Sequence, residues 1–184
     1  MLDEPTRDRL LAAAENLLLS SDYDEVSVRA INTAAGMNPA AVHYHFGSKE
    51  ALVAALLERR LAPLWAAELT RVTERRQTGW VPGVAELVDV IMGPFVGLVA
   101  EPHGRLHVRL LARLVLGRRP VSWASGWFGF APWVELLRAA RPDLSADEAK
   151  ARWMLAFDLI VQTFSAGGEA KALRSFVIAG LDAP

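Results

Sequence analysis

Four histidines carry the side chains with the most evident chemistry, and they fall into two pairs. His43 and His45 are two residues apart, so on a helix they point about 200° away from each other and cannot bind one metal ion. His103 and His107 have the four-residue spacing of a two-histidine metal site, but the glutamate of the metalloprotease motif is missing and no third ligand is evident. We therefore expect no metal and no other cofactor. A small all-α enzyme that uses His103, His107 or Asp158 remains an alternative.

A run of small residues near position 40 suits contact with the bases of DNA. Asn38 has an amide that can donate or accept a hydrogen bond, while Ala40 and Ala41 let the backbone approach and offer methyl groups to thymine. Lys49, at the start of the following helix, can hold a phosphate with its ammonium group and the adjoining backbone amides. The polar and aromatic candidates between these positions are His43, Tyr44 and His45.

Short helices in the first 48 residues would position these side chains. Leucine and alanine residues with helical spacing predict an amphipathic helix over 6–20. Ser27 can cap a second helix over 28–34, which ends at Gly36 because glycine adopts a positive φ most easily.

The turn after Gly36 leads directly into a third helix. Asn38 and Pro39 predict its N-cap and first residue, because proline lacks the amide that would be unpaired there, and the helix should run to about His45. Two helices joined by so short a turn form a helix-turn-helix, whose second helix can enter the major groove with its N-terminal residues facing the bases.

Helical periodicity continues through the rest of the chain, and no segment shows the two-residue alternation of a strand. Ser48 caps a long helix over 49–78, which we expect to bend or divide near Pro63. Ser145 and Glu148 form a capping box at the start of another helix. Further helices are expected at about 84–99, 104–116, 132–140, 146–165 and 169–180, with an aromatic loop over 117–132. The predicted fold class is therefore all-α.

The segment from Ser27 to Leu52, with the helix before it, resembles the DNA-binding domain of the TetR family of bacterial transcriptional regulators. The most specific part is the run Tyr-His-Phe-Gly-Ser-Lys-Glu-Ala-Leu at 44–52. The resemblance implies an N-terminal helix-turn-helix domain over 1–48 and a C-terminal helical ligand-binding and dimerisation domain over 49–184.

The resemblance also implies roles for individual residues. Tyr44, His45 and Lys49 would hold phosphates, and residues 38–41 would meet the major groove. The complete set that we assign to DNA binding is Ser27, Arg29, Asn38, Ala40, Ala41, His43, Tyr44, His45 and Lys49. Three positions depart from the family's pattern, namely Asp22 for a turn glycine, Ala30 for an acid and His43 for a tyrosine.

Three arginines at four-residue spacing, Arg105, Arg109 and Arg113, share one face of a predicted helix. They form either an anion-binding stripe or an ordinary solvated face that pairs with acids elsewhere. The segments 104–113 and 130–133 are similar to a subgroup of the family that includes fatty-acid and acyl-thioester responsive repressors. A carboxylate or phosphate on an effector would meet Arg105 or Arg109.

Aromatic residues crowd the second half of the chain, close to glycines and prolines that interrupt its helices. They form either a pocket with a deformable wall or simply the core. The candidate ligand-binding residues are Phe95, Arg105, Arg109, Leu110, Trp123, Trp127, Phe128, Trp133 and Phe157.

The predicted helix over 146–165 has more apolar residues than one buried stripe uses. We expect the surplus to form a homodimer interface, in which this helix and the one over 132–140 make a four-helix arrangement with their copies. The residues assigned to that interface are Trp153, Ile160, Val161 and Phe164. A dimer would place two DNA-binding domains on half-sites about 34 to 36 Å apart.

Composition limits the remaining classes of function. Residues 1–60 have six basic and nine acidic side chains, a formal charge of −3, so we expect weak non-specific DNA binding. The 184-residue chain has no cysteine, no signal-peptide pattern and no apolar run of the roughly 18 to 20 residues that a membrane helix needs. We expect a cytoplasmic protein without a membrane partner.

Together these features predict a ligand-responsive repressor. Its partners would be a palindromic double-stranded DNA operator and an apolar or amphipathic small molecule that releases the protein from that operator. Besides the small enzyme, the other alternative is a helical adaptor without sequence-specific DNA binding.

Overall fold

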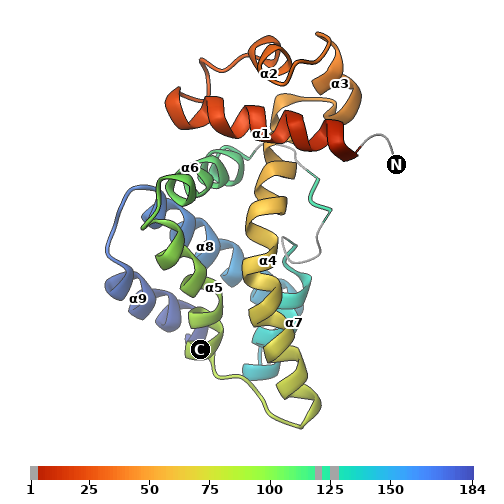
Figure 1. The fold of residues 1–184 in the computed structure, drawn as a ribbon. Coiled ribbons are helices and arrows are strands. Elements are labelled where there is room, and N and C mark those ends of the chain that lie inside the picture. The colour runs from red at the N-terminus through yellow and green to blue at the C-terminus, as the bar shows by residue number, and fades with distance from the viewer. Residues whose placement is uncertain (1–3, 119–121, 125–128) are drawn as a thin grey trace.

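The computed structural model describes residues 4–118, 122–124 and 129–184, and all regular structure in these ranges is helical (Figure 1). In chain order the helices are α1 (Glu4–Ser20), α2 (Val28–Ala34), α3 (Ala41–Phe46), α4 (Lys49–Gln77), α5 (Val84–Leu98), α6 (Pro102–Leu116), α7 (Ala131–Ala140), α8 (Ala146–Ser165) and α9 (Ala170–Asp182). This confirms the all-α prediction. Trp127 and Phe128, two of the candidate ligand-binding residues, lie outside the described residues.

Helices α1, α2 and α3 form a small unit, here called the head, which lies across the N-terminal end of α4 (Figure 1). Leu10 of α1, Ile31 of α2 and Val42 of α3 are all fully buried between these helices. Leu52 and Leu56, in the first turns of α4, belong to the same buried cluster. The start of α4 therefore shares its apolar contacts with the head.

The long helix α4 connects the head to the rest of the molecule, here called the body (α4–α9). It runs without interruption through Pro63, so the division expected at that residue does not occur. Because proline has no backbone N–H, the carbonyl four residues earlier, at Arg59, receives no helical hydrogen bond from it.

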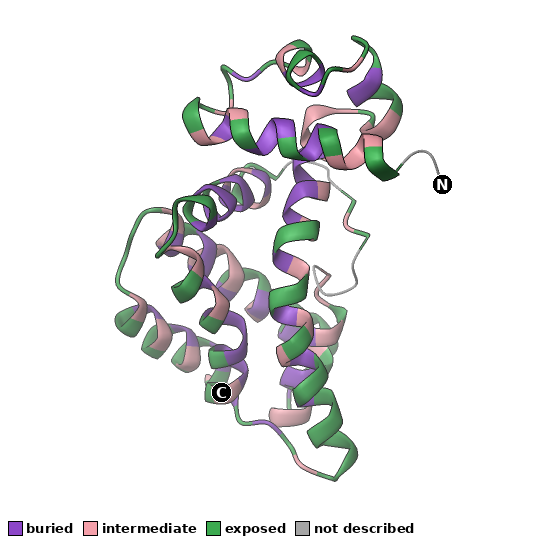
Figure 2. Ribbon diagram, in the orientation of Figure 1, coloured by how far each residue is buried: buried purple, intermediate pink, exposed green. Residues whose placement is uncertain are grey.

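The body is built around α8, which packs against α6, α7 and α9. Buried residues line the inward faces of these helices, and exposed residues cover the outer ones (Figure 2). Trp153 and Phe95 are the largest fully buried side chains. A Cβ atom at Gly104 would collide with the backbone carbonyl of Leu98, so glycine lets α6 start directly against the end of α5.

The predicted helix ends agree with the structure to within two residues, and the start of α3 is one of those that differ by two. It begins at Ala41 instead of Pro39, and its N-cap, Ala40, has no capping side chain. Asn38 nevertheless accepts a hydrogen bond from the Ala40 amide at 3.0 Å, so its side chain closes the turn instead of capping the helix. Among the described helices, none is long and apolar enough to cross a membrane.

Candidate DNA-binding site

Helix α2 is fixed at both ends by the residues that the sequence analysis selected. The Ser27 hydroxyl accepts a hydrogen bond from the Ala30 amide at 3.1 Å, and Gly36 has a φ of 66° in the turn after the helix. The side chain of Arg29, in the first turn of α2, is exposed to solvent.

The turn between α2 and α3 is held by Asn32, a residue that the sequence analysis did not select. Its side-chain amide donates to the carbonyl of Pro39 at 2.6 Å, and its side-chain oxygen accepts from the Val42 amide at 3.1 Å. Asn32 is only 1% exposed, so both bonds are sheltered from water. A polar side chain beside Ile31, on the apolar face of a short helix, was the signal that could have identified it.

The exposed surface of the turn and of α3 carries most of the predicted DNA-binding residues. Asn38, Ala40, His43 and Tyr44 are all exposed, and Tyr44 is the most exposed of them at 83%. Ala41 requires a correction, because it is 4% exposed and packs in the core of the head. Its methyl group is therefore not available to a thymine base.

The far end of α3 is tied back to α1. Arg7 donates to the carbonyl of His45 at 2.6 Å, and its guanidinium lies 4.3 Å from the centre of the Phe46 ring. His43 Nδ1 lies 2.9 Å from the carbonyl oxygen of Gly47 and acts as the donor, because a carbonyl only accepts. The edge of the Tyr44 ring meets His45, with ring centres 4.9 Å apart. These contacts hold the exposed face of α3 in one orientation.

Lys49 does not extend into solvent as the phosphate-binding prediction requires. Its ammonium donates to the carbonyl of Tyr23 and lies 3.9 Å from the centre of the Tyr23 ring. Burial lowers the pKa of Lys49, and Arg113 lowers it further, while Asp24 and Glu50 act in the opposite direction. Lys49 therefore connects α4 to the loop after α1 in this structure.

Arginine partners offset part of the negative charge of the head. Asp8 pairs with Arg59, and Asp24 pairs with Arg113 at 2.5 Å. Glu15 pairs with Arg60, also at 2.5 Å. None of these carboxylates belongs to the exposed surface of the turn and α3, so repulsion of phosphate by them is reduced.

The histidine pairs do not form metal sites. In the described part of the chain, no group of three or more histidine, cysteine, aspartate or glutamate side chains is arranged to hold a metal ion. His107 is instead bonded to Glu15, with its Nε2 atom 2.7 Å from Oε1.

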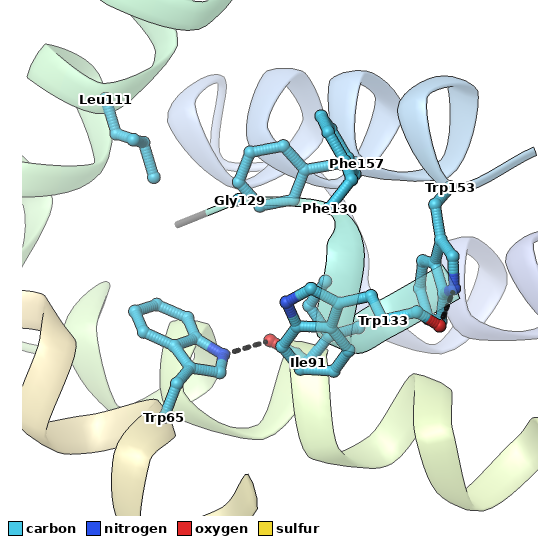
Figure 3. Close-up of a pocket in the computed structure, with 8 residues that line it drawn as sticks. All are labelled: Trp65, Ile91, Leu111, Gly129, Phe130, Trp133, Trp153 and Phe157. Atoms are coloured by element: carbon cyan, nitrogen blue, oxygen red, sulfur yellow. Dashed lines mark hydrogen bonds between the residues drawn. The ribbon is translucent and has the colours of Figure 1, made fainter. Parts of the chain in front are cut away.

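A small apolar cavity of about 40 Å³ lies between α4, α5, α6, α7 and α8 (Figure 3). Its described lining is Trp65, Ile91, Leu111, Gly129, Phe130, Trp133, Trp153 and Phe157. Of the candidate ligand-binding residues, the structure brings Trp133 and Phe157 to this cavity. The indole N–H of Trp65 donates to the Ile91 carbonyl at 3.0 Å, and that of Trp153 donates to the Trp133 carbonyl at 2.7 Å.

The other candidate ligand-binding residues lie elsewhere. Phe95 is fully buried in the core, stacked on Phe164. Arg105 and Arg109 are exposed and line a separate surface groove that reaches the turn between α8 and α9. The remaining described candidates are Leu110, which is buried, and Trp123, which packs half-buried against the core.

The prediction that four residues of α8 form a dimer interface is wrong. Trp153, Ile160, Val161 and Phe164 are all at most 5% exposed and pack inside one chain. The surplus of apolar residues in α8 arises because this helix has neighbours on several sides, α7 among them. The exposed apolar side chains on α8 and α9 are instead Met154, Leu155 and Phe176.

Comparison with known proteins adds to this geometry. The family model described as "Bacterial regulatory proteins, tetR family" matches residues 10–56, which include α1, α2, α3 and the first turns of α4. By this match residues 10–56 of the chain are similar to the tetR family. The sequence resemblance of the N-terminal region is thus confirmed.

Two curated relatives match part of this chain. The HTH-type transcriptional regulator UidR of Escherichia coli K12 is 36% identical over 63 residues, which are 32% of this chain and 32% of UidR. The uncharacterized HTH-type transcriptional regulator YwcC of Bacillus subtilis is 42% identical over 57 residues, 31% of this chain and 26% of YwcC. The aligned part is therefore about a third of the length of these relatives, or less.

Two solved structures match the chain along almost its whole length. NalD, the secondary repressor of the MexAB-OprM multidrug efflux pump in Pseudomonas aeruginosa, has a TM-score of 0.57 at 20% identity, covering 97% of this chain and 93% of NalD. A putative TetR-family transcriptional regulator from Mesorhizobium loti has a TM-score of 0.52 at 18% identity, covering 100% of this chain and 96% of its own. At these identities the likeness establishes the fold of the body and nothing about its ligand.

Proposed function

We propose that this chain is a DNA-binding transcriptional regulator that represses from a palindromic operator. The observation that carries the proposal is the exposed surface of the turn and α3, where Asn38, Ala40, His43 and Tyr44 project from a frame held by the buried Asn32. The match to the tetR family supports the same assignment for the head. Asn38 and Ala40 would face the bases, with His43, Tyr44 and His45 nearer the phosphates.

The test is selection of duplexes from a random-sequence library by the purified protein. We expect enrichment of a two-fold symmetric sequence, and replacement of Tyr44 by Ala should weaken binding to it by about tenfold, as expected for a well-placed contact. Lys49→Ala should weaken binding to all duplexes, because it removes the contact of α4 with Tyr23 and so loosens the position of the head. Lys150→Ala, an exposed lysine on α8, is the matched control. Enrichment of no sequence would favour the helical adaptor instead.

We propose that the chain acts as a homodimer through the outer face of α8 and α9. Leu155 and Phe176 are 73% and 68% exposed, which is unusual for large apolar side chains of a monomer, and Met154 lies beside Leu155. Sedimentation should give a dimer at micromolar concentration and a monomer for Leu155→Glu. Val81→Glu, at an exposed valine before α5, is the control and should remain dimeric. A wild-type monomer would contradict this interface.

We propose that the effector is a small, uncharged apolar molecule that enters the aromatic cavity. No described side chain lining the cavity is charged, and two of its indole groups are already hydrogen-bonded within the protein. Burying an unpaired carboxylate there would be costly. The cavity is smaller than the roughly 150 Å³ that holds benzene in a dry protein interior, so a ligand must move the walls contributed by α4 and α6.

Matched pairs of compounds test the effector proposal. Naphthalene and indole should raise the melting temperature and release the selected duplex, whereas naphthoate and indole carboxylate should do neither. An effect of the acids alone would favour the groove at Arg105 and Arg109. Phe157→Ala, which enlarges the cavity, should shift the preference to larger compounds, and Lys150→Ala on the exposed side of α8 is its control.

A further inference from the structure

A buried charged cluster lies where the head meets the body, and it is separate from the surfaces described above. Glu15 of α1 and His107 of α6 are 4% and 5% exposed. Arg60 of α4 completes the cluster. Glu15 and His107 are 92 residues apart in the chain, so the cluster joins helices that only the tertiary fold brings together.

The carboxylate of Glu15 binds side chains from two helices of the body, α4 and α6. Arg60 Nε lies 3.1 and 3.2 Å from its two oxygens, and a second guanidinium nitrogen lies 2.5 Å from Oε2. His107 Nε2 lies 2.7 Å from Oε1. Burial acts to raise the pKa of Glu15, but the hydrogen bonds and charges of Arg60 and His107 prevail and lower it. The carboxylate is therefore ionised, and His107 must be the donor.

A second contact joins α6 to the head, but this contact is exposed to solvent. Arg113 pairs with Asp24, whose side chain is 75% exposed, and lies over the Tyr23 ring at 4.3 Å. Exposed pairs of this kind contribute little to stability, whereas a buried polar group that loses its partner is costly. The position of α1 on α6 therefore depends more on His107 than on Arg113.

The charge on His107 is set by groups from three helices. Burial lowers the pKa of His107, the hydrogen bond and charge of Glu15 act to raise it, and Arg60 and His103 lower it again. The net direction is downward from the ordinary value of 6.5, so the ring is neutral at pH 7. Arg60 already balances Glu15, and a proton on His107 would place an excess positive charge in a buried site.

We propose that His107 is a positioning residue for the head, and that its protonation releases α1 from α6 and weakens operator binding. This inference rests on the proposed function for its effect on DNA, although the release of α1 does not. A released head is less well pre-organised for two half-sites at a fixed separation, so part of the binding free energy is lost in ordering it.

The sign of the pH effect follows from proton linkage. The released state, with His107 in water, binds a proton near pH 6.5, while the closed state binds it only at lower pH. Falling pH therefore favours release below about 6.5, and above that value the closed state has no such penalty.

The experiment measures affinity for the selected duplex at pH 7.5 and 5.5, at constant salt, for the wild type, His107→Gln and His103→Gln. Glutamine retains an N–H that can donate to Glu15 but does not titrate. We expect acid to weaken the wild type and His103→Gln by about tenfold relative to His107→Gln, a factor within the usual range of coupling between two sites. His43 and His45 are present in all three proteins, so the comparison between variants cancels their contribution.

Hydrogen exchange of the α1 amides, measured without DNA, reports directly on the release of α1 from α6. Protection around Glu15 should fall at pH 5.5 in the wild type and in His103→Gln, but not in His107→Gln. Equal exchange in all three proteins would overturn the proposal. A loss of protection in the wild type without the difference in DNA affinity would overturn its regulatory part. If no duplex is selected, the proposed function fails, and the exchange measurement still decides whether His107 positions the head.

Discussion

The head and the body of this molecule are specified in different ways. The head consists largely of short helices whose ends are fixed by nearby side chains, such as Ser27 at α2, and by glycines with positive φ at 36 and 47. The body depends on large aromatic side chains from distant parts of the chain, such as Trp65, Phe95 and Phe164, whose ring centres are 5.1 and 5.2 Å apart in succession.

This difference explains why the two regions are recognisable to different degrees. Caps and turns use particular residues at fixed spacings, so a family model matches the sequence of the head. A close-packed apolar core tolerates many substitutions that conserve its volume, so the body matches solved structures in fold at 20% identity or less.

The largest expected effect is in the aromatic core of the body. Trp153→Ala should lower the free energy of unfolding by about 4 kcal/mol, because a fully buried indole is replaced by a void next to an existing cavity. Urea denaturation followed by circular dichroism measures this loss. Lys150→Ala, on the exposed side of the same helix, should change stability by no more than about 0.5 kcal/mol. Similar losses for both variants would show that the body does not depend on its aromatic core.

In the head, a single buried polar side chain should matter nearly as much. Asn32→Ala should cost about 3 kcal/mol, because the Pro39 carbonyl and the Val42 amide would both lose their partner. Hydrogen exchange of α2 and α3 is the measurement, and selective binding to duplex DNA should be lost with it. Thr33→Ala, the exposed neighbour, serves as the control. Retained protection of α3 in Asn32→Ala would mean that apolar contacts alone hold the head.

Substitution of two adjacent arginines on α4 compares an ion pair to a buried carboxylate with an ion pair on the surface. Arg60→Ala leaves the buried Glu15 without its guanidinium and should cost about 2 kcal/mol, less than a fully buried pair because Arg60 itself is 46% exposed. Arg59→Ala removes a pair with the exposed Asp8 and should cost about 0.5 kcal/mol or less. Thermal unfolding at pH 7 distinguishes them. A loss in Arg60→Ala that is not larger than in Arg59→Ala would contradict the role given to Glu15.

Helix caps should show the smallest effects, and the same effect in both regions. Ser27→Ala at α2 and Ser145→Ala at α8 each remove one hydrogen bond to a backbone amide and should each cost about 1 kcal/mol. Replacement of either serine by aspartate should restore most of the stability. If only Ser27→Ala destabilised the protein, local signals would matter in the head alone.

Features that depend on neighbouring residues were predictable from the sequence. The capping box of Ser145 and Glu148 and the bounds of α8 agree with the structure, because each is decided within a few residues. The start of α3 was predicted two residues early, because Asn38 suits a turn as well as an N-cap. The residues around Asn38 do not decide between a turn and an N-cap, because its side chain accepts a hydrogen bond from a nearby backbone amide in either case.

Features that depend on the tertiary fold were not predictable. The number of apolar residues in α8 predicts a dimer interface, whereas Ile160 and Val161 are fully buried by neighbouring helices of the same chain. The contact between Glu15 and His107 joins two helices whose relative position no spacing rule supplies. The separation of Arg105 from the aromatic cavity is of the same kind, because it depends on which side of α6 faces α8.

The uninterrupted course of α4 through Pro63 has a mechanical consequence. Pro63 is 14 residues from Lys49, so at 1.5 Å per residue the head sits at the tip of a lever arm about 21 Å long. A tilt of about 10° at Pro63, where one rung of the hydrogen-bond ladder is already absent, would swing the tip by about 4 Å. That swing exceeds the rise of roughly 3.4 Å between successive base pairs. A small change in the angle of α4 at Pro63 would thus displace the head by at least the spacing of one base pair along the DNA.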